Sequence, residues 1–216
     1  MKTKWSSVER MMWISISFTL FLVAFRFLYF AQLQFGFYLW NLFLAILPLL
    51  LSRQLYKQKK LNLKALIILA CWLLVLPNAP YIITDIFHFF ERPPVPKWFD
   101  LLLVTSAAWN GLMLGIVSLM QVEQFLAIHF SSWKVNAYIS GILLLTAYGI
   151  YIGRFLRFNS WDVLTNSSSL ARQLGSSFLF PWRHVSTWAF TIFFSAFFWL
   201  VYYTIKKISS VTAGGI

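Results

Sequence analysis

The chain has 216 residues, of which 60% are apolar and 11% are charged. Soluble domains average about 45–50% apolar and about 25% charged residues, so this composition excludes an ordinary water-soluble globule. The formal charge of +12 comes from basic residues scattered between apolar runs. Such scattering indicates membrane topology and not a nucleic-acid-binding face. The single cysteine, Cys71, excludes an intrachain disulfide and any multi-cysteine metal site.

The apolar runs provide for six membrane spans, since a transmembrane helix needs about 20 mostly apolar residues. The first run follows Lys2, Lys4 and Arg10 without a small-residue cleavage site, so we predict a retained first span. We therefore expect an all-α polytopic transmembrane helical bundle that forms one integral membrane domain over residues 1–216. The predicted spans are residues 12–30, 36–51, 61–76, 99–120, 137–151 and 186–205.

The positive charges predict an orientation, because short cytoplasmic loops of membrane proteins are enriched in Lys and Arg. The densest basic cluster, residues 53–64, follows the second span and is therefore expected in the cytoplasm. With six spans, both ends of the chain are then cytoplasmic. Four of the six cations that this orientation places outside lie in the connection between the fifth and sixth spans, namely Arg154, Arg157, Arg172 and Arg183.

The third span is expected to end in a break or a sharp kink at Pro77 and Pro80, because proline lacks an amide hydrogen and disfavours helical geometry before it. Polar residues then recur at helical spacing, which predicts a short amphipathic helix at the outer interface, with Asn78 capping its first turn. The polar stripe either lines a polar site or only meets water. It consists of Tyr81, Thr84, Asp85 and His88.

A second polar group follows the fifth span and begins with Arg154 and Arg157. If the helix of that span continues, both guanidinium groups lie on one face and can hold a phosphate or a carboxylate. The alternative is that each side chain reaches out to lipid headgroups. Asp162 is either part of this site or a capping residue at the start of a helix.

The orientation places His88 and His184 on the same side as Asp85 and Asp162. Two imidazoles and two carboxylates form a ligand set that zinc or another divalent metal uses. No metal-binding spacing such as HExxH accompanies these residues, so the sequence supports the site only weakly and names no metal or cofactor.

Within the membrane, Arg26 needs a partner or a route to the interface. It lies near the outer end of the first span, where it is expected to reach the headgroups or to pair with Asp85 or Asp162. Gly111 and Gly115 have the four-residue spacing that lets transmembrane helices approach closely. We interpret this glycine pair as a packing feature.

Three segments together resemble a bacterial family called domain of unknown function 1361. They are Leu-Pro-Asn-Ala-Pro-Tyr-Ile-Ile-Thr-Asp at 76–85, Trp-Asn-Gly at 109–111, and Gly-Arg-Phe-Leu-Arg-Phe-Asn-Ser-Trp-Asp at 153–162. The resemblance covers about residues 61–200. It implies a multi-pass protein of the bacterial cytoplasmic (inner) membrane, and it implies no activity, cofactor or catalytic residue.

Our preferred hypothesis is an outward-facing polar pocket that binds, among membrane lipids, an anionic lipid headgroup or an envelope precursor. If the protein is an enzyme, Asp85 or His88 is the candidate general base, because a carboxylate and an imidazole one turn apart can set each other's protonation. The residues of the predicted pocket are Asn78, Tyr81, Asp85, His88, Arg154, Arg157 and Asp162.

Two other functions stay open. In a small proton-coupled transporter, Arg26 and Asn110 would join Asp85 and His88 in lining a path across the membrane. Asn110 needs polar partners in any case, because it lies within the fourth span. In a non-catalytic scaffold or accessory subunit, the outer motifs around Trp161 would form a docking surface.

Overall fold

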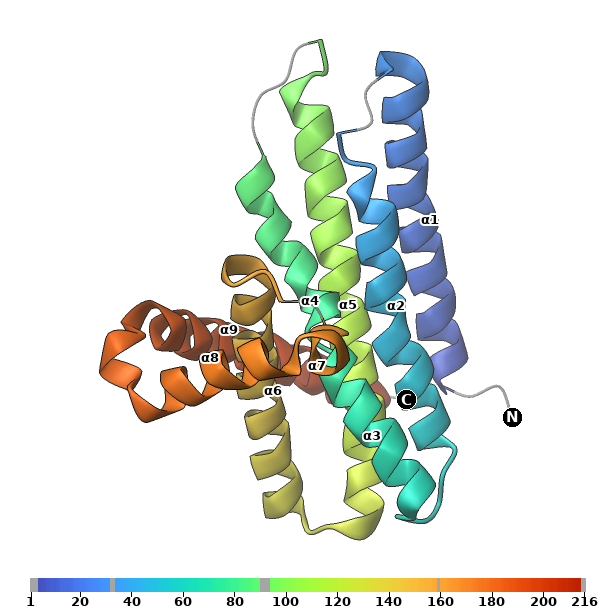
Figure 1. The fold of residues 1–216 in the computed structure, drawn as a ribbon. Helices are drawn as coiled ribbons and strands as arrows, with labels where there is room; N and C mark the ends of the chain where they lie inside the picture. The colour runs from blue at the N-terminus through green and yellow to red at the C-terminus, as the bar shows by residue number, and fades with distance from the viewer. Residues whose placement is uncertain (1–3, 32–33, 90–93, 159, 215–216) are drawn as a thin grey trace. The chain divides into compact units, whose positions relative to one another are not determined.

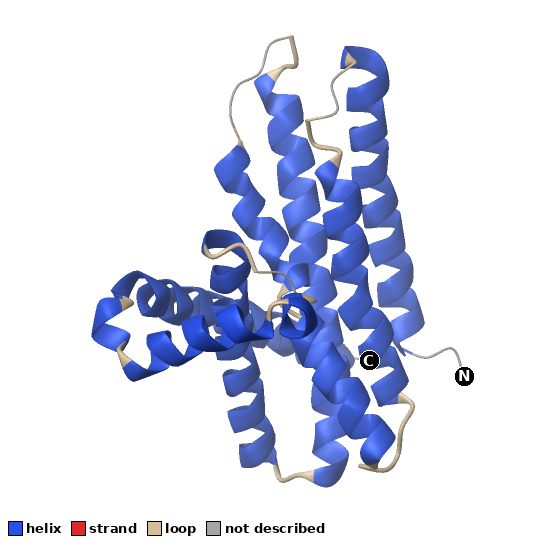
Figure 2. Ribbon diagram, viewed as in Figure 1, coloured by secondary structure: helices blue, strands red, loops and turns tan. Residues whose placement is uncertain are grey.

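The computed structural model describes residues 4–31, 34–89, 94–158 and 160–214. Helices account for most of these residues, and no strand occurs among them (Figure 2), which confirms the all-α prediction. The chain divides into two compact units, Met1–Phe125 and Leu126–Ile216, which are described separately below.

Unit 1 contains long helices that run side by side, and one of them continues through a proline-rich segment (Figure 1). The last turn of its final helix belongs to unit 2. The elements are α1 (Lys4–Phe30), α2 (Phe37–Tyr56), α3 (Leu63–Val75), α4 (Asn78–Tyr81), the 3-10 helix η1 (Ile82–His88) and α5 (Lys97–His129).

Unit 2 is built on two long helices that pack with opposite directions. Tyr148 of the first stacks on Trp188 of the second, and the hydroxyl of Tyr203 donates to the side-chain oxygen of Asn136. Short helices connect the two. The elements are α6 (Ser132–Phe155), α7 (Asp162–Thr165), α8 (Ser167–Leu179), the 3-10 helix η2 (Pro181–Arg183) and α9 (Val185–Gly214).

Among the described residues, six helices are long and apolar enough to span a membrane, as predicted. The third span is longer than expected and covers Leu63–Phe87, and the fourth extends to His129. The fourth span continues past its predicted end because Gln121 is buried and bonded within unit 1, where its polar side chain does not need water. That both ends of the chain lie in the cytoplasm stays a prediction.

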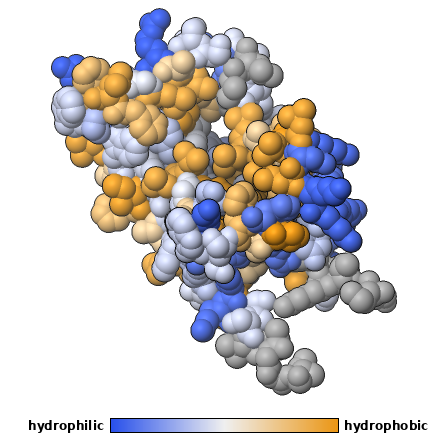
Figure 3. Space-filling view, turned by 90° about the horizontal axis from the view of Figure 1, so that it is seen from below, coloured by the Kyte–Doolittle hydropathy of each residue, from blue (hydrophilic) through white to orange (hydrophobic). Residues whose placement is uncertain are grey.

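The core of unit 1 lies between α1, α2 and α5. In α2 it contains Tyr38, Leu42, Ala45 and Leu49, whose spacing of four, three and four residues places them on one helical face. Large apolar side chains elsewhere on these helices are exposed, and the space-filling view shows broad hydrophobic areas (Figure 3). Lipid is the solvent that such a surface requires.

The sequence predicted a break or a sharp kink at the proline-rich segment. There α3 ends at Val75 and residues 76 and 77 form a turn, but the span continues as α4 and η1. Pro80 cannot donate to the carbonyl of Leu76, and the amide of Ala79 donates there instead, over 3.1 Å. That shift releases the carbonyl of Val75, which accepts from the side-chain amide of Asn78 over 3.0 Å. The two substitute donors keep the backbone satisfied inside the membrane, so the span continues past the turn at residues 76 and 77 into α4 and η1.

Helix α4 lies directly against α5 at the two glycines. A Cβ atom added at Gly111 would collide with the backbone carbonyl oxygen of Ala79, and one added at Gly115 would lie 3.3 Å from Cδ of Pro80. The spacing of these glycines therefore provides close helix packing, as the sequence predicted.

Candidate functional site

Arg26 forms a buried, two-pronged ion pair with Asp100 at one end of unit 1. Its Nε lies 2.7 Å from Oδ1 and its second donor nitrogen 3.1 Å from Oδ2, and both side chains are at most 2% exposed. The ring of Phe35 lies 4.8 Å from the guanidinium carbon. Asp100 is in the first turn of α5, where the helix dipole favours a negative charge.

This pair corrects the sequence prediction for Arg26. Neither Asp85 nor Asp162 forms this salt bridge, and the buried guanidinium does not reach outward to headgroups. A signal for the pairing was present, because Asp100 starts the fourth span at the end where the first span finishes.

Asp85 lies on η1 and is 2% exposed. One carboxylate oxygen accepts from the side-chain amide of Asn41 on α2 over 2.9 Å. Thr84 is also buried, whereas Phe87 is 59% exposed. Two members of the predicted polar stripe therefore point into unit 1, and Asn41 is a partner that sequence reasoning missed.

Three further residues of the predicted pocket lie in unit 1, namely Asn78, Tyr81 and His88. Asn78 does not cap the helix, because Pro77 occupies the cap position and the Asn78 amide donates to a carbonyl of the preceding turn. Tyr81 is half-buried, and its carbonyl accepts from the hydroxyl of Thr84. His88 ends η1, and its side chain lies outside the described residues.

In unit 2, the helix that carries Arg154 ends at Phe155. Arg157 then adopts a left-handed backbone conformation with φ of 59°, which turns the chain so that the amide of Phe158 meets the carbonyl of Ile152. The prediction that a continuing helix holds both arginines on one face is therefore wrong. Arg154 is half-buried and Arg157 is exposed.

Asp162 is the first residue of α7 and accepts from the hydroxyl of Thr165 over 3.1 Å. This contact joins two side chains, and the start of α7 has no side-chain cap bond, so it does not decide between the two roles that the sequence left open for Asp162. His184 lies 3.3 Å from the hydroxyl of Ser176, measured from its Nε2. Among the residues that the structure describes, no three His, Cys, Asp or Glu side chains are placed to hold a metal ion.

The carboxyl end of α8 is fixed to both long helices of unit 2. The hydroxyls of Ser177 and Tyr148 share a hydrogen bond of 2.5 Å, and the indole of Trp188 donates to the Ser177 carbonyl. Beyond this anchor, large apolar side chains are exposed: Leu179 is 70% and Trp182 67% accessible. The connection thus presents an apolar edge on a fixed support.

Polar contacts also join α1 to α5 within unit 1. The side-chain amide of Asn110 donates to the hydroxyl of Thr19 over 2.7 Å and to the carbonyl of Ser15 over 3.1 Å. Thr19 shares a further hydrogen bond with Ser106. These contacts confirm that Asn110 has partners inside the membrane.

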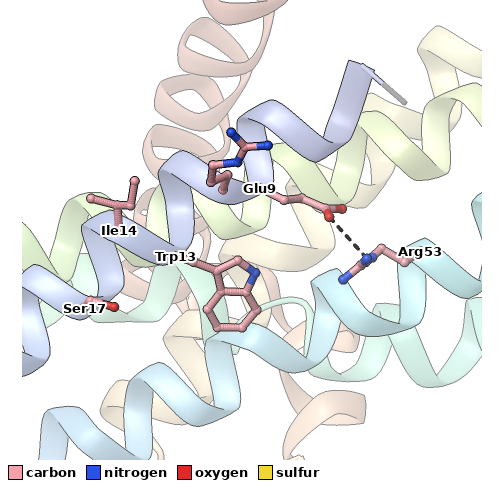
Figure 4. A pocket seen from close by; sticks show the side chains of 6 residues that line it. Glu9, Trp13, Ile14, Ser17 and Arg53 are labelled. Carbon is pink, nitrogen blue, oxygen red and sulfur yellow. Dashed lines mark ion pairs between the residues drawn. The ribbon is translucent and has the colours of Figure 1, made fainter. Parts of the chain in front are cut away.

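A further polar group lies where α1 begins and α2 ends. Ser52 donates to Gln121, Gln121 donates to Glu9 over 3.4 Å, and Glu9 pairs with Arg53 over 3.3 Å. Beside this pair is an open groove of about 490 Å³ (Figure 4). Its lining residues are Glu9, Arg10, Trp13, Ile14, Ser17 and Arg53. Sequence reasoning did not identify this site.

A family model described as "Protein of unknown function (DUF1361)" matches residues 40–201, which are 162 of the 216 residues. The chain belongs to this family. The match begins earlier than the predicted resemblance at about residue 61 and includes most of α2, whereas α1 lies outside it. No curated protein and no solved structure matches this DUF1361 chain.

Two of the three segments that carry the DUF1361 resemblance meet in the fold. The residues 76–85 form the proline-rich helical segment, and residues 109–111 provide the glycine against which α4 packs. The third segment, residues 153–162, begins in the last turn of α6 and reaches the start of α7 at Asp162, and its residue 159 lies outside the described residues. For this DUF1361 protein, packing thus explains the first two segments. It does not explain Arg157 in the third segment, because that side chain is exposed.

Proposed function

We propose that this multi-pass membrane protein binds the anionic headgroup of a lipid, or of a lipid-linked envelope precursor, at the connection between α6 and α9. Residues 154–184 contain four arginines and one aspartate, a formal charge of +3. Arg157, Arg172 and Arg183 are exposed. In the predicted orientation these cations lie outside, where the positive-inside rule gives them no topological reason to gather.

The backbone conformation of Arg157 is the observation that carries the proposal. A left-handed residue other than glycine costs roughly 1–2 kcal/mol relative to ordinary helical geometry. Glycine at this position would remove that cost, and the exposed arginine side chain does not recover it through burial. A guanidinium kept under strain on the surface indicates a ligand that requires it.

The environment of α8 supports a lipid as the source of the anion. The apolar edge formed by Phe178, Leu179 and Trp182 is at least 56% exposed at each residue, and aromatic side chains of this kind favour the membrane interface. Arg183 lies over the ring of Phe180, with 5.4 Å between its guanidinium carbon and the ring centroid. An arginine on such an edge lies at headgroup depth.

Binding to purified full-length protein tests the proposal. We expect Arg157→Gly and Arg157→Ala each to weaken binding of phosphatidylglycerol about fivefold, since one interfacial arginine contributes about 1 kcal/mol. Arg157→Gly should unfold at the same temperature as the wild type or higher, because glycine relieves the strain. Lys134→Gln, which removes a charge at the other end of α6, is the control. Unchanged binding by Arg157→Gly would contradict the proposal.

The enzymatic version of the proposal assigns Asp85 of unit 1 as general base, with Asn78, Tyr81 and His88 as candidates of the same unit. Arg154 and Asp162 stay substrate-binding candidates of unit 2. The contact with Asn41 supports Asp85, because it holds one carboxylate oxygen in a fixed position. Asp85→Asn should keep the thermal unfolding midpoint while turnover of a lipid-linked substrate is lost. Turnover that survives this substitution would exclude Asp85 as the base.

A small proton-coupled transporter is the second candidate, favoured by the polar contacts between α1 and α5. The contacts of Asn110, Thr19 and Ser106 provide polar groups in the inner part of the membrane. In proteoliposomes, Asn110→Ala should abolish proton-driven flux, while Thr105→Ala, at an exposed position on the same helix, should not. Equal flux in both variants would reject this candidate.

A further inference from the structure

The groove where α1 begins and α2 ends has the chemical character of a lipid site. Trp13 lies between the two helices, and the carboxylate of Glu9 reaches across to Arg53 (Figure 4). Arg10 lines the same groove and is exposed. Two arginines and one glutamate leave a formal charge of +1 in the groove.

The charges are fixed unevenly, and this asymmetry favours an anion. Glu9 is only 11% exposed at its side chain and is held from two sides, by Arg53 and by the amide of Gln121. Arg53 remains 42% exposed. Among the described residues, Arg10 forms no ion pair. The accessible part of the groove is therefore cationic, while its one acid is already neutralised.

The groove continues into an apolar track along α1. Trp13, Ile14 and Ser17 follow the charged residues, and one turn further on a second groove of about 260 Å³ begins at Phe21. From Arg10 to Phe21 the helix rises about 16 Å at 1.5 Å per residue. That length is about half of the 30 Å hydrocarbon core, which is the depth that one acyl chain occupies.

We infer that this groove binds one anionic glycerophospholipid, with the phosphate between Arg10 and Arg53 and an acyl chain over Trp13, Ile14 and Ser17. Guanidinium groups suit phosphate, and a tryptophan suits the interface just below it. In the predicted orientation the site faces the cytoplasmic leaflet. The inference is independent of the proposed function, because it concerns α1 and α2 of unit 1, whereas the proposed function concerns unit 2.

Native mass spectrometry of the full-length protein, titrated with phosphatidylglycerol or phosphatidylcholine, measures the site. Titration of both wild type and Arg157→Gly separates it from the arginines of unit 2, whatever the outcome of the proposed function. We expect one phosphatidylglycerol to bind at least fivefold more tightly than phosphatidylcholine. Arg10→Gln should lower this affinity about fivefold, since one arginine at the membrane surface contributes about 1 kcal/mol.

A substitution with the opposite sign sharpens the test. Glu9→Gln keeps an oxygen that accepts from Gln121 but removes the acid and releases Arg53, so it should raise the affinity for phosphatidylglycerol severalfold. Lys59→Gln removes an equal charge from the same basic end of unit 1, outside the groove, and should have no effect.

Three outcomes would overturn the inference. Equal losses in Arg10→Gln and Lys59→Gln would show diffuse attraction to a basic surface. Displacement of the lipid by glycerol phosphate at equal concentration would show that the acyl chain is not bound. Equal binding of phosphatidylglycerol and phosphatidylcholine would show that the groove does not select an anionic headgroup. The groove on α1 would then be better explained as a contact surface for another helix.

Discussion

At the scale of single residues, the ion pair of Arg26 and Asp100 is the contact with the largest expected effect. Both side chains are buried, so removal of either charge leaves the other buried without its ion-pair partner. The sequence predicted that Arg26 needs a partner or an interface, but it did not identify Asp100 as that partner. Helix packing decides which of several outer acids reaches the guanidinium.

We expect Arg26→Gln and Asp100→Asn each to lower the stability of the protein by about 3–5 kcal/mol, because each breaks a buried pair. Thermal unfolding in detergent, followed by circular dichroism, measures the change. Arg26→Lys should be intermediate, since lysine keeps the charge but cannot form both bonds.

The double variant Arg26→Met with Asp100→Leu is the matched control, since it leaves no unpaired charge. It should be more stable than either single variant. If the double variant instead lost as much stability as the two single variants added together, the two residues would act independently. The single losses would then not come from breaking the ion pair.

At the scale of elements, the sequence predicted six apolar helices correctly and misjudged how two of them continue. The prolines end the regular helix α3 at Val75, as predicted, but the span continues through Pro80 because the amide of Ala79 and the side chain of Asn78 replace the missing donors. Likewise, polar Gln121 did not end the fourth span, because its partners lie inside unit 1. Both errors concern tertiary or side-chain hydrogen bonds, which a local pattern does not contain.

The glycines permit a matched prediction about two helices. Gly111→Ala should destabilise the protein by about 1–3 kcal/mol, because the new methyl group meets the backbone carbonyl of Ala79, which cannot move aside alone. Gly141→Ala, in α6, has no atom within 4 Å of the new Cβ, and should be neutral or stabilising by up to about 1 kcal/mol.

The unfolding midpoints of the two glycine variants, measured under the same conditions, decide between them. Equal effects would mean that α4 does not rest on α5 as closely as described. A loss of stability confined to Gly111→Ala would indicate that residues 76–85 and 109–111 are both needed for the contact between α4 and α5.

At the scale of the whole molecule, sidedness determines whether the predicted outward pocket can exist. Its residues belong to both units, with Asp85 in unit 1 and Arg154 in unit 2. That both residues face outward is a prediction, which rests on the distribution of positive charges among the loops. The prediction that residues 1–216 form a single domain likewise stays a prediction.

Cysteine labelling in intact cells tests the orientation. In a Cys71→Ser background, we expect an impermeant thiol reagent to label Pro94→Cys and Asn166→Cys, while Lys59→Cys is protected until lysis. Labelling of only one of the first two would place the candidate residues of the units on opposite sides and exclude the shared pocket. Both positions are exposed in the structure.

The pairing of α1 with α5 also has a consequence for biosynthesis. Arg26 and Asp100 are separated by 74 positions, and Asn110, which bonds to Thr19 and Ser15, also lies on α5. At a translation rate of about 5–20 residues per second, the first helix emerges roughly 4–15 seconds before the fourth. During that interval its arginine cannot have its final carboxylate partner. Because an unpaired arginine is costly in lipid, we expect the first helix to remain at a site that water can reach until the fourth helix is inserted.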